Sequence, residues 1–155
     1  MCNNCGCNVR SCSTTYTNSN QTVTEPVTTL SILGGEVTST GKCINAQATS
    51  IGKCINAQAS GFNVKASGLY RIGFDVTLDP TAAGTAIIQM TKDGVAMPEA
   101  VATVTTVANA LITVHVETTR YISVPCHING PAYGVTSSGV AGTVTHVAGY
   151  AVKLD

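Results

Sequence analysis

Charged residues are scarce in this chain. They make up 10% of its 155 residues, and the eight basic side chains balance the eight acidic ones. So little charge provides no basic patch for nucleic acid and no electrostatic attraction to an anionic membrane. A surface near zero net charge also lacks the usual protection against self-contact. The composition therefore argues against strong phosphate binding and favours association between copies of the chain.

Long apolar runs are also missing. No stretch approaches the roughly eighteen consecutive apolar residues that a membrane-spanning helix needs. The opening residues 1–7 have neither the basic region nor the apolar stretch of a signal peptide. We therefore expect no membrane insertion, and we expect exposure outside the cell without a conventional secretion signal.

Leucine and the long charged helix formers are scarce, whereas valine, threonine, alanine and glycine dominate. This bias favours pleated sheet. Residues 70–78 alternate between large apolar and mostly polar side chains, and Lys92-Asp93-Gly94 is a tight-turn signal. Other runs of the same type cover 27–33, 85–91, 101–107, 111–118, 121–128 and 143–154. The sequence predicts an all-β jelly-roll β-sandwich of about eight antiparallel strands.

The first 22 residues differ in composition from the rest. They are rich in Cys, Asn, Ser and Thr and contain almost no large apolar group. Such a segment cannot bury enough surface to order itself alone. We therefore expect a Cys-rich, flexible N-terminal connector arm over 1–22 and a single domain over 23–155, whose length suits one core.

A tandem duplication lies inside the predicted domain. Residues 38–48 recur as 49–59, with ten of the eleven positions identical. Two copies are too few for a solenoid. The simplest interpretation is a local duplication that lengthens a strand or loop and adds a second thiol, because Cys43 is repeated as Cys54.

Seven cysteines are more than a reduced cytosolic protein needs, and the odd number leaves at least one free or paired with another chain. Cys126 shares an expected strand face with Ile122, Val124 and Ile128, which predicts a core position. The candidates for inter-subunit disulfides are Cys2, Cys5, Cys7, Cys12, Cys43 and Cys54.

Metal and catalytic sites have weaker support. The spacing of Cys2, Cys5 and Cys7 can suit zinc, but no ordered second half-site follows. Cys126 and His127 are neighbours on one expected strand, so their side chains point to opposite faces. His115 is expected opposite the apolar face of its strand, and His146 on the face of Val144 and Tyr150, which does not make a metal triad.

No paired carboxylates, Gly-rich phosphate loop or nucleophile elbow appears in the chain. We therefore expect a protein that is not an enzyme and that needs no cofactor.

Residues 61–76, with Phe62-Asn63-Val64 and Gly68-Leu69-Tyr70-Arg71-Ile72, resemble the opening strands of the C1q/TNF-like jelly roll. Residues 89–94 and 147–154 also look like that family, especially like the C-terminal heads of bacillar exosporium filament proteins. The resemblance covers about residues 60–155. It implies compact trimers that use one sheet for their symmetric interface.

The N-terminal third departs from that family, because a Cys-rich arm and the duplication stand where a collagen-like stalk is expected. These features resemble bacterial endospore appendage subunits, whose arms lock neighbouring subunits covalently. The resemblance implies a self-assembling, disulfide-stabilised extracellular filament on a spore surface, with copies of itself and other spore-surface proteins as partners.

Two alternatives remain open. A trimeric receptor- or carbohydrate-binding head predicts exposed aromatic loop residues, for which Tyr121 and Tyr133 are the candidates. A phage structural protein shares the fold and symmetry but seldom needs a cysteine-rich arm.

Overall fold

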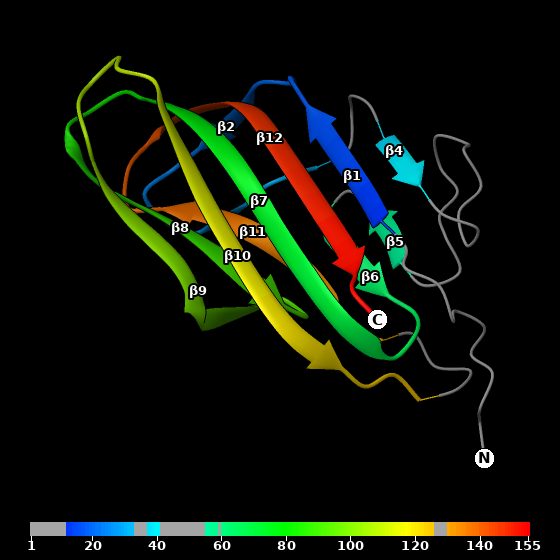
Figure 1. Ribbon diagram of the computed structural model, residues 1–155. Helices are drawn as coiled ribbons and strands as arrows, with labels where there is room; N and C mark the ends of the chain where they lie inside the picture. Colours follow the sequence, from blue (N-terminus) through cyan, green and yellow to red (C-terminus); the bar gives the residue numbers. More distant parts are fainter. Residues whose placement is uncertain (1–11, 33–36, 41–54, 59, 126–129) are drawn as a thin grey trace.

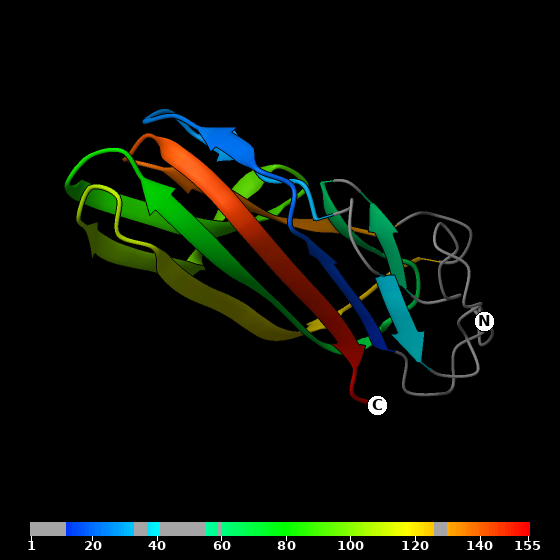
Figure 2. The ribbon, with the colours of Figure 1, turned by 90° about the horizontal axis from the view of Figure 1, so that it is seen from above.

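The computed structural model describes residues 12–32, 37–40, 55–58, 60–125 and 130–155. Every regular element among them is a β-strand, and the strands form two antiparallel sheets that face each other (Figures 1 and 2). The prediction of an all-β jelly-roll sandwich is confirmed. The described residues form twelve strands against about eight expected, because several short strands extend the sheets.

Sheet A contains the long central strands. Its order is β10-β7-β12-β1-β4, and β2 pairs with β12 beyond the end of β1. The strands are β1 (Cys12–Thr17), β2 (Gln21–Val23), β4 (Val37–Thr40), β7 (Gly68–Pro80), β10 (Ile112–Ile122) and β12 (Gly142–Lys153).

Sheet B has the order β5-β6-β11-β8-β9, and β3 pairs with β11 beside β6. The strands are β3 (Thr28–Thr29), β5 (Ile55–Gln58), β6 (Gly61–Val64), β8 (Gly84–Lys92), β9 (Val95–Thr106) and β11 (Ala132–Ser138).

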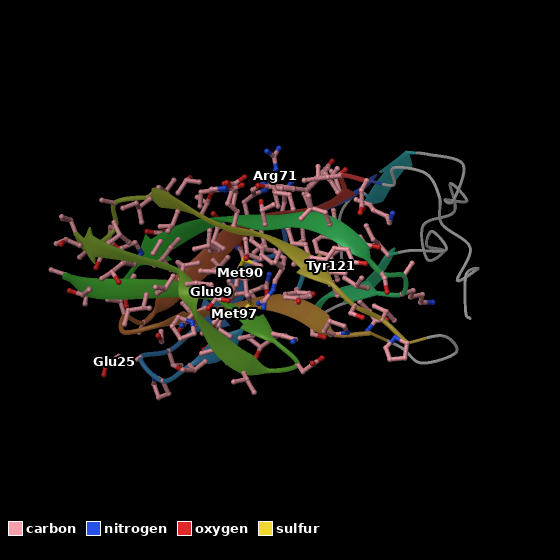
Figure 3. All side chains as sticks on the ribbon, turned by 60° about the horizontal axis from the view of Figure 1, so that its bottom comes forward. Glu25, Arg71, Met90, Met97, Glu99 and Tyr121 are labelled. Carbon is pink, nitrogen blue, oxygen red and sulfur yellow. The ribbon has the colours of Figure 1, made fainter. Side chains whose placement is uncertain are left out.

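The core lies between the two sheets. The even-numbered residues 70–78 of β7 are fully buried, as the alternation predicts. The rings of Phe62 and Phe74 meet across the sandwich with centroids 5.8 Å apart. Gly149 lets these rings lie close to β12, because a Cβ there would be 3.0 Å from both. The side chains of Met90 and Met97 fill the space near β9 (Figure 3).

The N-terminal boundary differs from the predicted one. Residues 12–17 form β1, which pairs with β12 from Cys12 opposite Val152 to Thr17 opposite Val147, and also with β4. The predicted arm extends to residue 22 because the first 22 residues contain almost no large apolar side chains. Here backbone hydrogen bonds to two neighbouring strands order a threonine-rich segment. Residues 1–11 lie outside the described residues, so an arm there stays a prediction.

The strand pattern near the C-terminus also needs correction. The break expected at Thr119-Arg120 is wrong, because both residues continue the pairing of β10 with β7. The run expected over 121–128 ends its strand at Ile122, and β11 was not predicted at all. Gly134 weakens the strand pattern of β11 in the sequence. The fold requires glycine there, because a Cβ would lie 2.3 Å from the carbonyl oxygen of Ser60.

The expected hairpin is confirmed. Lys92 pairs with Val95, and the two turn residues have positive φ, 51° for Asp93 and 80° for Gly94. Asp93 also fixes the turn to β11, because its Oδ1 accepts a hydrogen bond from the amide of Ala132 at 2.8 Å.

The two copies of the duplicated unit contribute to different sheets. Thr38–Thr40 of the first copy belong to β4 in sheet A, whereas Ile55–Gln58 of the second copy form β5 in sheet B. Ile55 is a core residue that is 1% exposed. The remaining residues of the two copies lie outside the described residues.

Candidate functional site

The outer face of sheet A carries a network that joins three strands. Tyr150 of β12 lies opposite Gly73 of β7, and Gly73 lies opposite Glu117 of β10. The hydroxyl of Tyr150 donates a hydrogen bond to Oε2 of Glu117. The ring crosses the space that a side chain at position 73 would fill, because a Cβ there would lie 2.5 Å from the hydroxyl oxygen.

His115 occupies the next outward position on β10. Its Nδ1 lies 2.8 Å from Oδ1 of Asp75, and its Nε2 lies 3.4 Å from Oε2 of Glu117. Its ring stacks on that of Tyr150, with centroids 6.2 Å apart and an interplanar angle of 13°. On the other side of the cluster, Cζ of Arg71 lies 5.9 Å from the Tyr150 ring centroid. Arg71 projects away from the sandwich (Figure 3).

The electrostatics of this network follow from its geometry. The hydrogen bond from Tyr150, followed by the one with His115, lowers the pKa of Glu117 from its usual 4.5. Burial and the bond to Glu117 raise the pKa of Tyr150 to about 12. The side chains of His115, Asp75 and Glu117 are 44–47% exposed, so this is an open sheet face. Among the described residues, no group of His, Cys, Asp and Glu is arranged to hold a metal ion.

The expected placement of the histidines is half correct. His115 is exposed opposite the buried Val114 and Val116, as the alternation predicts. His146 does not share the face of buried Val144, because an irregularity in β12 places Val144 opposite Leu78 but His146 opposite Thr77. Instead, Nδ1 of His146 lies 2.5 Å from Oδ1 of Asn18, and its ring contacts that of Tyr16.

A second feature lies along one side of the sandwich, where β9 and β10 run side by side. Among the described residues, seven large hydrophobic side chains are exposed, and five of them lie on β9, β10 or the connection between these strands. These five are Val95, Val101, Val107, Leu111 and Tyr121. We call the middle three, Val101, Val107 and Leu111, the edge strip.

The two strands of this side differ in how open their edges are. β9 contains Pro98 and a register shift opposite Gln89–Thr91, both of which hinder strand addition. β10 pairs only with β7 among the described strands, and it has neither a proline nor a bulge. Arg120 of β10 joins the two sheets here, because its Nη1 lies 3.2 Å from Oε1 of Glu99 on β9.

A hollow of about 450 Å³ opens at the end of β10. It is lined by Lys92 and Asp93 of the β8–β9 turn, by residues 120–123, by Tyr133 and by residues of the connection to β11. Tyr121 is 64% exposed, as expected, but it lies on strand β10 and not in a loop. Tyr133 is not a surface residue but is 1% exposed, because it lies on the core-facing side of β11, a strand that the sequence pattern did not reveal.

Most of the singled-out cysteines lie outside the described residues: Cys2, Cys5, Cys7, Cys43, Cys54 and Cys126, together with His127. Cys12 is the first residue of β1. The disulfide, zinc and core assignments of these residues therefore stay predictions. Among the described residues, no helix is long and apolar enough to cross a membrane.

No protein-family model and no curated protein matches the sequence. Similar folds occur among solved structures. The PRD1 vertex protein P5 matches with a TM-score of 0.61 and 13% identity, over 94% of this chain and 97% of that one. The Eiger TNF of S. frugiperda matches with a TM-score of 0.52 and 9% identity, over 95% and 92%. The globular domain of zebrafish complement 1qA gives 0.46 and 10%, over 92% and 95%.

These neighbours are C1q/TNF-like jelly-roll heads and a phage vertex protein, and they are structural or signalling proteins. At such low identity the likeness shows the shared fold only.

Proposed function

We propose that this chain is a structural subunit without an active site, which assembles with its own copies into a disulfide-stabilised extracellular filament on a bacterial endospore. The observation that carries the self-assembly is the edge strip. Val107 and Leu111, in the connection between β9 and β10, are 64% and 67% exposed, and Val101 of β9 is 44% exposed. Covering apolar surface gains about 25 cal/mol per Å².

The open edges of sheet A offer a mode of contact. Among the described strands, β10 ends the sheet on one side and β4 ends it on the other. A strand edge presents unpaired amides and carbonyls, to which a second copy can add a strand. Joining two different edges is a heterologous contact, which does not close on itself and so extends into a filament when the rotation allows it.

The cysteine-rich segment supports the covalent part of the proposal. β1 begins at Cys12 opposite Val152, near the end of the chain, so residues 1–11 are attached at this end of the sandwich. Cys2, Cys5 and Cys7 precede β1 by five to ten residues. Cross-links from this segment to a neighbour would add to the non-covalent contacts, at about 2–4 kcal/mol each by analogy with intramolecular disulfides.

Electron microscopy of the purified full chain tests this function, together with reducing and non-reducing gels after boiling. We expect filaments, and a ladder of bands that reductant collapses to the monomer. Replacing Cys2, Cys5 and Cys7 by serine should abolish the ladder but leave folded protein. Discrete particles with a monomer band under both conditions would contradict the proposal.

A phage structural role is the second candidate, and the similarity of the whole chain to the PRD1 vertex protein P5 favours it. It also involves self-association, but it does not require the cysteines near the N-terminus. Closed oligomers of fixed size that are insensitive to reductant would favour this second candidate, or a trimeric C1q/TNF-like head, over a filament.

A further inference from the structure

The hollow at the end of β10 contains a tyrosine hydroxyl that makes no hydrogen bond to a described residue. Tyr133 is 1% exposed and lines the hollow. The side chain of Tyr133 makes no hydrogen bond within the described part of the chain. Its hydroxyl is not among the fully buried side-chain oxygens without a partner there, which belong to Thr15 and Ser137. Its phenol group therefore keeps contact with the open space. The hydroxyl is therefore available to donate a hydrogen bond to a ligand in the hollow.

Two cations accompany this hydroxyl. Lys92 and Arg120 both line the hollow. Burial raises the pKa of the Tyr133 phenol, and the positive charge of nearby Arg120 acts in the opposite direction. Arg120 uses one nitrogen on Glu99, and the other donors of its guanidinium remain for a ligand. Asp93 offsets part of this charge, but its Oδ1 already accepts the amide of Ala132. The free hydrogen-bonding capacity of these groups is mostly that of donors.

The rim of the hollow is aromatic and apolar. Tyr121 is 64% exposed toward the end of β10 (Figure 3), and Pro131 lines the side that leads to β11. An exposed tyrosine ring offers a flat surface to the C–H face of a sugar ring, while its hydroxyl can bond sugar hydroxyls. A volume of about 450 Å³ is within the range of ordinary ligand sites.

We propose that this hollow binds an acidic saccharide, that is, a sugar that carries a carboxylate. Arg120 and Lys92 receive the carboxylate, the Tyr133 hydroxyl donates to an oxygen of the sugar, and the ring of Tyr121 packs against its face. This binding is additional to self-assembly and does not depend on it. No residue of the edge strip takes part.

Saturation-transfer difference NMR and titration calorimetry on the full chain test the proposal, with sodium glucuronate and glucose as the probes. These two sugars differ at C6, where one has a carboxylate and the other a hydroxymethyl group. Both methods work on single subunits and on large assemblies, so the result is independent of whether filaments form. We expect glucuronate to bind with millimolar affinity and glucose to bind at least about tenfold more weakly.

Tyr133→Phe removes only the hydroxyl and should weaken glucuronate binding about tenfold. Tyr150→Phe is the matched control on the outer face of sheet A, and it should leave the affinity unchanged. Arg120→Met should remove binding, and circular dichroism will show whether that variant keeps its fold. Lys92→Met, at an exposed turn position, gives the same test without the loss of the Glu99 contact.

Three results would overturn the assignment: glucose that binds as tightly as glucuronate, an unchanged affinity in Tyr133→Phe, or no transfer signal from glucuronate. Sodium acetate separates a sugar site from a site for any carboxylate. Acetate that displaces glucuronate at equal concentration would also rule out an acidic saccharide as the specific ligand.

Discussion

The hydroxyl of Tyr150 on β12 donates a hydrogen bond to the carboxylate of Glu117 on β10, although β7 lies between these two strands. The bond can cross β7 because the residue between Tyr150 and Glu117 on that strand is Gly73, which has no side chain in the way. The contact between Tyr150 and Glu117 on the outer face of sheet A thus depends on the absence of a side chain at position 73.

Gly73→Ala should break this arrangement. The new Cβ would lie 2.5–2.8 Å from the hydroxyl end of the Tyr150 ring, which must move away from Glu117. We expect the pKa of Glu117 to rise toward 4.5 and that of Tyr150 to fall from about 12. Carboxyl NMR titration and ultraviolet titration of tyrosine measure the two values. Gly84→Ala, on β8 of the other sheet, is the control, and equal titration curves in both variants would refute the link.

The same bond predicts an acid dependence of stability. The folded-state pKa of Glu117 is lowered, so its contribution is present above pH 4.5 and is lost as pH falls through the lower folded value. Glu117→Gln should therefore reduce stability at neutral pH, by no more than about 1 kcal/mol for so exposed a group, and the deficit should vanish in acid. Thermal melts across this range measure it. A deficit in Glu117→Gln that persists in acid would count against this origin.

Two buried threonines of β1 form a matched pair. Thr15 Oγ1 is buried without a hydrogen-bond partner, whereas Thr17 Oγ1 accepts the amide of Ser19 at 3.1 Å. Thr15→Val should stabilise the protein by about 1 kcal/mol, and Thr17→Val should destabilise it by a similar amount. Urea unfolding of both variants measures this difference. Equal effects on the two sites would mean that the hydroxyls are not what distinguishes them.

Truncation separates the N-terminal segment from the sheet. Deleting residues 2–11 leaves β1 intact, so we expect a folded protein that melts near the wild-type temperature but forms no reductant-sensitive ladder. Deleting residues 2–17 removes a strand that lies between β12 and β4, and it should lower the melting temperature strongly. If both deletions melt alike, β1 is not an integral strand of the sheet.

The sequence predicts best those parts of the fold in which a local pattern is strong. The alternation over 70–78 and the Lys92-Asp93-Gly94 turn identify β7 and the β8–β9 hairpin, because both depend on residues close together in the chain. β1 and β11 were not recognised, since a threonine-rich segment and one with Gly134 at its centre are ordered by distant partners.

The site shows the same division between local and distant effects. The outward position of His115 follows from alternation along β10. Its neighbour Tyr150 comes from β12, and His146 changes face because of an irregularity that depends on pairing with β7. Such cross-strand relationships require the register, which no single-strand pattern contains.

Self-association through the edge strip is the central claim, and sedimentation velocity of Leu111→Lys and Val27→Lys tests it most directly. Leu111 is 67% exposed within the strip, and Val27 is 70% exposed outside it, so neither substitution disturbs the core. We predict that Leu111→Lys shifts the protein from large assemblies to small species, while Val27→Lys sediments like the wild type. Large assemblies in both variants, or none in the wild type, would contradict the account.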